Sequence, residues 1–213
     1  MKERIIFSDD CLAEGMVWLS DHDPKLAEAY TRVLAEVGPL PLRLRPEGFQ
    51  ALLSAIVSQQ VSVASANAIW ARMEGAGLTD RAAMAAASDD DLRGVGLSRQ
   101  KARYGRALAQ SGVVFDDLRT RPTVDVVSDL TAIPGIGRWT AEIYAMFALA
   151  RADVFAPADL ALQEAARAIY DLPARPSERA LRAMAEAWSP WRSVAARLLW
   201  SYYRLVKQRE GIR

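Results

Sequence analysis

Apolar residues recur at helical spacing along almost the whole chain, whereas the alternation typical of β-strands is scarce. Only the stretch RIIFS near the start reads faintly as a strand. Since a repeat of three to four residues places apolar side chains on one face of a helix, the pattern predicts an all-α protein. The expected helices cover residues 24–37, 49–74, 80–87, 89–94, 98–111, 124–131, 138–150, 159–170, 177–188 and 190–208.

The residues at the ends of these segments favour the same interpretation. Asp23 followed by Pro24 is typical of a helix start, and Ser98 can cap the helix that follows it. Gly38 and Pro39 end the first predicted helix. The connections are short, which favours compact packing of neighbouring antiparallel helices.

The overall charge gives no sign of a strongly basic surface. The 213 residues carry a formal net charge of +1, and 25% of them are charged. The overall charge therefore does not indicate a nucleic-acid or membrane partner, although local basic patches and backbone amides can also bind phosphate. A chain of this length can bury a sizeable core, either as one domain or as two small lobes.

Cys11 is the only cysteine and His22 the only histidine. These counts exclude a disulfide within the chain, a four-cysteine zinc site and a four-cysteine iron–sulfur cluster. A Ser-His-Asp or Cys-His mechanism would have to use His22, whose context SDHDPK favours a capping or solvated role. If the chain is an enzyme, carboxylates are expected to do the acid–base chemistry.

The sequence contains no segment suited to crossing or entering a membrane. No window approaches 18 apolar residues, and the first residues, MKERIIFSDD, have no long apolar core. We therefore expect neither a signal peptide nor a membrane span. The predicted location is cytoplasmic, associated with the nucleoid if the source is bacterial.

A glycine turn lies between two predicted helices in AIPGIGRWTA, residues 132–141. Pro134 ends the first helix, while Gly135 and Gly137 permit backbone angles closed to other residues and expose the surrounding N–H groups. The helix that begins near Arg138 adds the positive end of its dipole, so the turn can bind an anion such as a phosphate. An ordinary helix–helix connection is the alternative. The candidate anion-binding residues are Pro134, Gly135, Ile136, Gly137 and Arg138.

An isolated aspartate, Asp159, stands at the start of the predicted helix of residues 159–170. In this position its carboxylate is a favoured N-cap. The helix dipole also favours a negative charge there, and an ionised carboxylate can stabilise a developing positive charge or activate water. The two roles are compatible, and the local sequence leaves both open.

The hairpin, the helix after it and the pattern DVF-x-P-x-D in this order resemble the helix–hairpin–helix DNA glycosylase superfamily. Further stretches resemble the 3-methyladenine DNA glycosylase II type: FQALLSAIVSQQVSVASA (49–66), GLSRQKARYGRALA (96–109) and WSPWRSVAARLLW (188–200). The matches run from Phe49 to Trp200, over two thirds of the chain. Four ordered motifs are far more specific than any one of them alone.

The resemblance implies a monofunctional DNA glycosylase of base excision repair. Such an enzyme flips an alkylated purine, of the 3-methyladenine or 7-methylguanine type, out of double-stranded DNA and hydrolyses its N-glycosidic bond. By position, Asp159 is the catalytic carboxylate. Trp139 stands where lyase-competent relatives have a Schiff-base lysine, so water is expected to attack the sugar and leave an intact abasic strand. Lys101 lies elsewhere and is expected to contact phosphate or to pack.

Trp139 and Trp200 match positions at which this branch lines its base pocket with aromatic rings. Such rings suit alkylated purines, which carry positive charge. Ile143 and Ser201 stand where the best-known pocket has tyrosines, so the pocket is expected to be less aromatic and the preferred base stays open. Core packing is the alternative role for both tryptophans.

Gln59 and Gln60 lie on the turn that resembles the family's wedge, which fills the base stack after a nucleotide is flipped out. Leucine is frequent at the second position, but Gln60 can also fill the gap and hydrogen-bond the orphaned base. A solvated surface pair is the alternative. Arg192 and Ser193 match family positions and are expected to tie the last helix to the structure beneath it.

The resemblance also implies two helical lobes with a DNA-binding cleft between them. Residues 48–151 are expected to form the lobe with the helix–hairpin–helix motif. Residues 1–47 and 152–213 are expected to form the second lobe, with Asp159 at the border. The chain resembles the compact form, without the extra N-terminal α/β domain of larger bacterial members, and we expect it to act as a monomer.

No cofactor and no iron–sulfur cluster are expected, although carbonyls near Thr131 and Ile133 are candidates for binding Na⁺ or K⁺. Three alternatives to the alkylbase glycosylase stay open. The first is a non-catalytic DNA-binding protein in which Asp159 is only an N-cap. The second is a helical scaffold for protein–protein interactions. The third is a glycosylase for deaminated, oxidised or mismatched bases.

Overall fold

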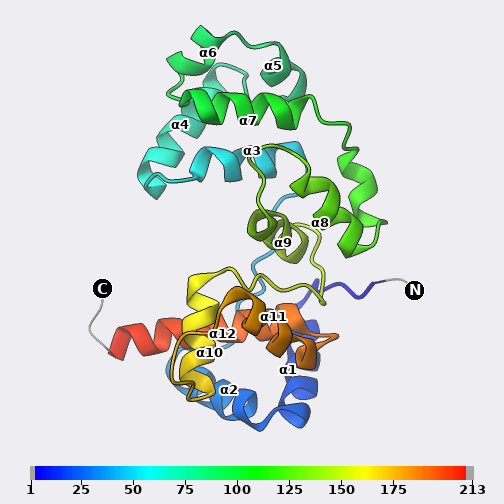
Figure 1. Cartoon of the computed structure of the whole chain (residues 1–213), viewed down its shortest axis with the longest axis vertical. Coiled ribbons are helices and arrows are strands. Elements are labelled where there is room, and N and C mark those ends of the chain that lie inside the picture. Colours follow the sequence, from blue (N-terminus) through cyan, green and yellow to red (C-terminus); the bar gives the residue numbers. More distant parts are fainter. Residues whose placement is uncertain (1–2, 210–213) are drawn as a thin grey trace. The chain divides into compact units, whose positions relative to one another are not determined.

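A computed structural model describes residues 3–209 of the chain (Figure 1). Two compact units divide the chain: a central unit of residues 45–144, and a split unit formed by the segments before residue 45 and after residue 144. The units divide after residues 44 and 144, three and seven residues before the lobe boundaries predicted after residues 47 and 151. The later boundary falls inside a helix, because α9 (Arg138–Phe147) runs across it.

Within residues 3–209 the regular structure consists of α-helices and short 3-10 helices, with one isolated β-bridge and no strand. The predicted all-α class is confirmed. The stretch RIIFS, which reads faintly as a strand, forms only this bridge, between Ile5 and Arg151. The helices of the split unit are α1 (Asp9–His22), α2 (Pro24–Glu36), α10 (Leu160–Ile169), α11 (Glu178–Met184), η2 (Ala185–Trp188) and α12 (Arg192–Arg209). The helices before α9 in the central unit are α3 (Phe49–Ser58), α4 (Val63–Gly75), α5 (Arg81–Ala86), α6 (Asp89–Gly94), α7 (Arg99–Ala109), η1 (Phe115–Arg119) and α8 (Thr123–Thr131).

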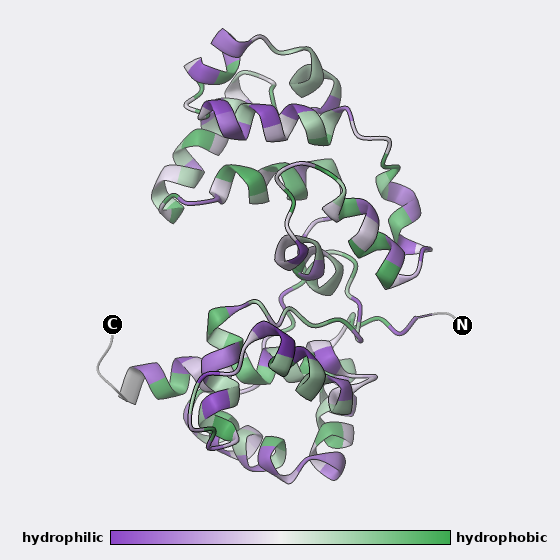
Figure 2. Cartoon of the chain, in the orientation of Figure 1, coloured by the Kyte–Doolittle hydropathy of each residue, from purple (hydrophilic) through white to green (hydrophobic). Residues whose placement is uncertain are grey.

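The core of the split unit is built around α12, which packs against α1, α2 and α10 (Figure 1). Its buried apolar residues follow the helical repeat predicted from the sequence. They include Val194, Leu198, Leu199, Tyr202 and Leu205. Colouring by hydropathy shows hydrophilic and hydrophobic stretches on the same helices, as expected for amphipathic elements (Figure 2).

Helix α1 was not predicted from the sequence. Ser8 caps it, because its Oγ accepts the N–H of Cys11 at 3.4 Å. A Cβ atom at Gly15 would lie 2.7 Å from Cγ2 of Val194 and 2.8 Å from Cε3 of Trp191, so the glycine allows α1 to pack closely on α12. Glycine lowers intrinsic helix propensity, and local sequence does not show that packing requires it. The buried residues of α1 are Leu12, Gly15, Met16 and Leu19.

The single helix predicted over residues 49–74 is wrong, because the chain turns between α3 and α4. Gln59 ends α3 in an extended conformation, and Gln60 has a φ angle of +56°. This left-handed conformation is uncommon for a residue with a side chain and interrupts the helix. Ser62 then caps α4 by accepting the N–H of Ser65 at 3.2 Å.

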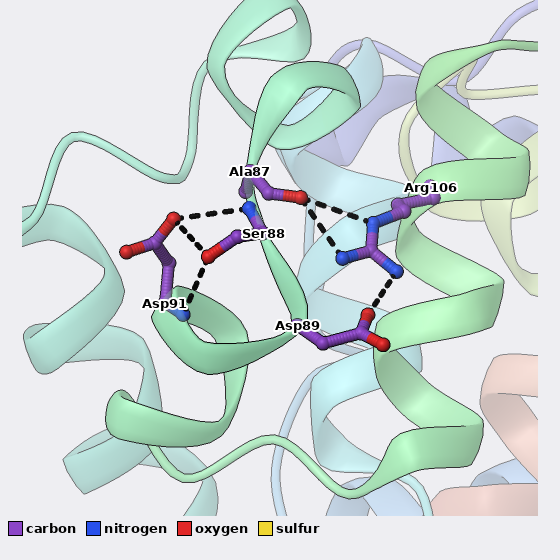
Figure 3. A network of polar contacts seen from close by, with 5 residues as sticks. All are labelled: Ala87, Ser88, Asp89, Asp91 and Arg106. Carbon is purple, nitrogen blue, oxygen red and sulfur yellow. Dashed lines mark hydrogen bonds and ion pairs between the residues drawn. The ribbon is translucent and has the colours of Figure 1, made fainter.

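A polar network joins the short helix α6 to α7 in the central unit (Figure 3). Ser88 caps α6, and the carboxylate of Asp91 accepts the Ser88 N–H at 3.0 Å, which completes a capping box. The Ser88 hydroxyl also donates to this carboxylate, and the hydrogen bonds from the hydroxyl and the N–H lower the pKa of Asp91. Arg106 of α7 donates to the carbonyl of Ala87 and to the carboxylate of Asp89. The acidic run SDDDL is therefore a capped and ion-paired helix start.

Replacing Gly15 with alanine is expected to destabilise the protein. The helix-propensity gain of about 1 kcal/mol is outweighed by overpacking against a buried ring, which costs about 1–3 kcal/mol. The net free energy of unfolding is expected to fall by about 1 kcal/mol, measurable by urea denaturation.

Gly75→Ala is the matched control. Gly75 ends α4 without a positive φ, and a Cβ atom there would meet nothing within 4 Å. That exchange is expected to leave the free energy of unfolding unchanged or to raise it. An increase for both variants would contradict the close contact between α1 and α12.

Candidate active site

The predicted hairpin joins α8 to α9 in the central unit. Ile133 donates its N–H to the carbonyl of Leu130 and accepts the N–H of Ile136, each at 3.1 Å. The side chains of Ile133 and Ile136 are buried and anchor the loop. Gly135 has a φ angle of +94°, so the hairpin depends on a glycine at its tip.

Gly135 is required for a second reason, which is contact with α7. A Cβ atom there would lie 2.3 Å from Cγ of Tyr104. Gly137 differs, because its φ angle is not positive, so the argument from backbone angles is wrong for this residue. Gly137 is exposed, and a Cβ there would meet nothing within 4 Å. Its missing side chain leaves the backbone before α9 open to a partner.

The start of α9 is a candidate anion site built mainly from backbone. The first N–H groups of an α-helix have no acceptor within the helix, and the positive end of the dipole lies there. Pro134 and Arg138 are exposed on either side of the turn. The Nε of Arg138 also pairs with the buried carboxylate of Glu142 at 3.0 Å, so part of its charge is balanced within the helix.

The two glutamines of the predicted wedge take different positions. Gln59 is half-buried, and its Nε2 donates to the carbonyl of Gly135 at 2.9 Å. Gln60 is exposed at the turn between α3 and α4. The sequence treats the two as a pair, but the structure ties Gln59 to the hairpin and leaves Gln60 as the exposed member.

Lys101 contacts backbone. Its Nζ donates to the carbonyl of Val57 near the end of α3 at 2.6 Å, and desolvation lowers the pKa of its ammonium group. Tyr104, one turn later on α7, packs against Gly135 and accepts a hydrogen bond from Gln100. Sequence reasoning missed Tyr104, although it lies in the same motif as Lys101.

Asp159 caps α10 in the split unit. Its Oδ1 accepts the N–H of Ala161 at 2.9 Å and that of Leu162 at 3.2 Å. The same oxygen accepts the indole Nε1–H of Trp200 at 3.2 Å. Three donors on one oxygen hold the carboxylate in one orientation, so the N-cap role is present whatever chemistry the residue performs.

Trp200 lies on α12 beside an aromatic and cationic cluster. Its ring is 5.6 Å from that of Phe147, and the guanidinium of Arg197 lies 4.7 Å above the Phe147 ring. Arg197 is buried and donates to the carbonyls of Leu42 and Ser193. Desolvation, with the nearby charge of Arg43, lowers the pKa of Arg197 to about 10. The cluster fixes the position of the indole that contacts Asp159.

The start of α12 is tied to the loop that leads to Asp159. Arg192 binds both carboxylate oxygens of Asp153, at 2.6 and 2.9 Å. The hydroxyl of Ser193 donates to the carbonyls of Arg151 and Val154. The tying role predicted for Arg192 and Ser193 is confirmed.

Of the other predicted residues, Trp139 lies on the first turn of α9 with 43% of its surface exposed. Trp139 belongs to the central unit, whereas Asp159 and Trp200 belong to the split unit. His22 is exposed and stacks on the ring of Trp18 at 4.0 Å, which fits the solvated role expected for it. The Na⁺ or K⁺ site near Thr131 and Ile133 stays a prediction.

Within residues 3–209, no three acidic, histidine or cysteine side chains gather closely enough to hold a metal ion. None of the helices described over that range combines the length and the apolar character needed to cross a membrane.

Comparison with known proteins gives consistent matches. The family described as HhH-GPD superfamily base excision DNA repair protein matches residues 53–192. DNA-3-methyladenine glycosylase 1 of Schizosaccharomyces pombe is 28% identical, over 100% of this chain and 95% of that protein.

Solved structures agree with these matches. The DNA-3-methyladenine glycosidase of Bacillus halodurans superposes with a TM-score of 0.81 at 30% identity, covering 98% of this chain and 95% of that one. The 3-methyladenine DNA glycosylase Mag1 of S. pombe, solved in complex with abasic DNA, gives a TM-score of 0.67 at 26% identity, covering 84% and 95%.

Replacing Asp153 with asparagine is expected to destabilise the protein in a pH-dependent way. Burial alone would raise the pKa of Asp153, but hydrogen bonds from Arg192 and Ser189 and the Arg192 charge lower it below its ordinary value. The stabilisation is therefore present above the unfolded-state pKa of about 3.9 and is lost as the pH falls through the folded-state pKa. At pH 7 the loss is expected to be about 1 kcal/mol, after allowance for partial exposure.

Urea denaturation at pH 7 and at pH 3 measures this difference, which is expected to shrink at the lower pH. Asp171→Asn is the control, because Asp171 forms an exposed ion pair with Lys25. It is expected to change stability little at either pH. A deficit for Asp153→Asn that is equal at both values would show that the charge of Asp153 is not what stabilises the loop.

Proposed function

Because the chain belongs to the HhH-GPD superfamily of base excision DNA repair proteins, we propose that it is a DNA glycosylase acting on alkylated purines of the 3-methyladenine or 7-methylguanine type. Similarity to 3-methyladenine glycosylases along nearly the whole chain supports the substrate class. The observation that carries the chemistry is the place of Asp159 in the ordered motifs, at the end of the pattern DVF-x-P-x-D that follows the hairpin and its helix. Three N–H donors on one oxygen hold its carboxylate in one orientation.

In the proposed reaction the bond between C1′ of the deoxyribose and the purine nitrogen breaks, and its electron pair leaves with the base. A purine alkylated at N3 or N7 is cationic before cleavage and departs neutral, so no general acid is needed to protonate it. This fits a chain whose one histidine is exposed and stacked on Trp18. The Asp159 carboxylate stabilises the oxocarbenium-like sugar, and water adds to C1′ and releases a proton.

The absence of lyase activity is part of the proposal. Trp139 replaces the amine that a Schiff-base mechanism requires, and Lys101 already donates its Nζ to the carbonyl of Val57. Water is then the nucleophile, and the product is an abasic strand without a break.

The hairpin is proposed to bind a phosphate of double-stranded DNA through the N–H groups that begin α9. The missing side chain at Gly137 and the positive dipole end favour such a contact without a strongly basic surface. Gln60 is proposed to fill the stack. Trp139 and Trp200 are proposed to offer aromatic faces to the cationic base.

A non-catalytic DNA-binding protein is the second candidate, and one observation favours it. Asp23 caps α2 with a similar set of donors: its Oδ1 accepts two backbone N–H groups, and its Oδ2 accepts the indole Nε1–H of Trp188. An aspartate cap that accepts a tryptophan N–H therefore also occurs outside the predicted site residues. A measurement of base release separates a glycosylase from a non-catalytic DNA-binding protein.

Asp159→Asn is expected to lower base release from methylated duplex DNA at least about 100-fold, the effect of losing one charge-stabilising group in a transition state. Asparagine remains a good N-cap, so the fold and the affinity for DNA are expected to persist. Release of methylated purines is measured under single-turnover conditions, and strand breaks are measured with and without later alkali.

Asp23→Asn is the matched control, since it changes the other aspartate cap that accepts a tryptophan N–H. It is expected to reduce stability while base release continues. Equal release by wild type and Asp159→Asn would exclude Asp159 as the catalytic carboxylate. Strand breaks before alkali would contradict the absence of lyase activity.

Trp200→Phe is expected to slow base release about tenfold, because it keeps an aromatic ring but removes the N–H donor to a charged carboxylate. Trp200→Ala is expected to slow it further by also removing the ring. Both are compared with wild type in the single-turnover assay at saturating enzyme. Wild-type rates for Trp200→Phe would show that the indole N–H has no part in holding Asp159 for reaction.

A further inference from the structure

We propose that Gln59 is a positioning residue that couples the exposed turn at Gln60 to the glycine hairpin of residues 132–137. The proposal rests on the proposed function, because it concerns how two segments that contact DNA act together. It is carried by contacts that lie entirely within the central unit.

The first contact fixes the tip of the hairpin. The Gln59 side chain donates to the carbonyl of Gly135, 76 positions away along the chain. The same peptide unit carries the N–H of Ile136, which donates to the carbonyl of Ile133 at 3.1 Å. The peptide between Gly135 and Ile136 is therefore hydrogen-bonded on both sides. Its plane sets the direction of the N–H groups that follow it at the start of α9.

The second contact fixes the end of α3, from which Gln59 extends. The Gln59 N–H donates to the carbonyl of Ile56 at 3.2 Å, and the Lys101 ammonium binds the carbonyl of Val57 at 2.6 Å. A cation at a helix C-terminus is favoured by the dipole, and it satisfies a carbonyl that the last turn leaves without a partner. The last turn of α3 is thereby a firm support for the Gln59 side chain.

The third contact comes from α7, which packs beside α3 (Figure 1). Lys101 and Tyr104 are one turn apart on this helix. Lys101 contacts α3, and Tyr104 packs against Gly135 so closely that no Cβ atom fits there. The side chain of Gln59 joins α3 directly to the hairpin. We call the three contacts Gln59–Gly135, Lys101–Val57 and Tyr104–Gly135 the brace.

The consequence concerns Gln60, the next residue after the brace. Its φ angle of +56° turns the chain away from α3 and leaves its side chain exposed. Since Gln59 is held by the hairpin, a displacement of Gln60 by DNA is transmitted to the peptide at Gly135, and binding of a phosphate at the hairpin fixes Gln60 in return. Filling of the base stack by Gln60 and binding of a phosphate at the hairpin are thereby coupled.

A double-mutant cycle tests the coupling. The probe is a duplex with a tetrahydrofuran abasic-site analogue, and affinity is measured by fluorescence anisotropy. Gln59→Met keeps an unbranched side chain of similar length without a donor, and is expected to weaken binding about fivefold, the net contribution of one hydrogen bond. Gln60→Ala is expected to weaken binding by a similar factor in wild type and by less than twofold in the Gln59→Met background.

Gln50→Met, the same exchange at an exposed position on α3, is the control and is expected to leave the effect of Gln60→Ala intact. Gln59→Glu, which replaces the donor with an acceptor facing a carbonyl, carries the test if Gln59→Met does not unfold cooperatively. Additive effects of residues 59 and 60 in the folded variants would overturn the proposal.

Hydrogen exchange of the DNA-free protein separates this proposal from the proposed function. The amides of residues 136–139 are expected to exchange faster in Gln59→Met than in wild type or Gln50→Met. Unchanged exchange would overturn the brace even if the enzyme releases methylated bases. Absence of base release by wild type, with faster exchange in the variant, would instead overturn the glycosylase assignment and leave the brace supported.

Discussion

Unsatisfied N–H groups at the start of a helix are the physical constraint behind two of the predicted site segments, the start of α9 in the central unit and the start of α10 in the split unit. In α10 the constraint is met from within, because Asp159 accepts two of these groups with one carboxylate oxygen. In α9 the residue before the helix is Gly137, which has no side chain to offer. One helix start thus carries its own anion, and the other suits an anion supplied by a partner. A glycosylase needs both, a fixed negative charge for the sugar and a place for the phosphate.

The pair Asp23 and Asp159 shows why local geometry does not identify a catalytic group. Each caps a helix and accepts a tryptophan N–H. Asp23 also accepts the hydroxyl of Tyr170, and burial together with this carboxylate raises the pKa of that tyrosine. Asp23 is thus bound on both oxygens by groups of its own unit and joins three helical segments. The assignment of Asp159 relies on its place in an ordered set of motifs, and that relation is carried by the sequence.

Helical periodicity and cap residues were enough to predict the all-α class and most helices, because amphipathic spacing and capping act locally. The hairpin was also predictable, since Pro134 and Gly135 mark a helix end and a left-handed turn. Helical periodicity did not show the break at Gln60, because glutamine carries no signal for a positive φ; only the resemblance of this segment to the family's wedge indicated a turn there. Helix α1 was missed for a related reason: Gly15 looks unfavourable until the ring of Trp191 is placed against it. The features that local sequence did not predict depend on contacts between residues far apart in the chain. The hydrogen bond from Gln59 to Gly135 is another such contact.

The charge balance of the central unit bears on how a nearly neutral chain can hold DNA. Several of its arginines are matched by carboxylates: Arg106 by Asp89, Arg119 by Glu47, Arg121 by Asp129 and Arg138 by Glu142. A matched arginine contributes less to the long-range field than a free one. Backbone N–H groups at a helix start bind an anion without carrying a net charge of their own, and the fold sets their direction. A fixed direction of these N–H groups favours phosphate binding without an added cation, and the hairpin tip is held by Gln59, Tyr104 and the buried isoleucines.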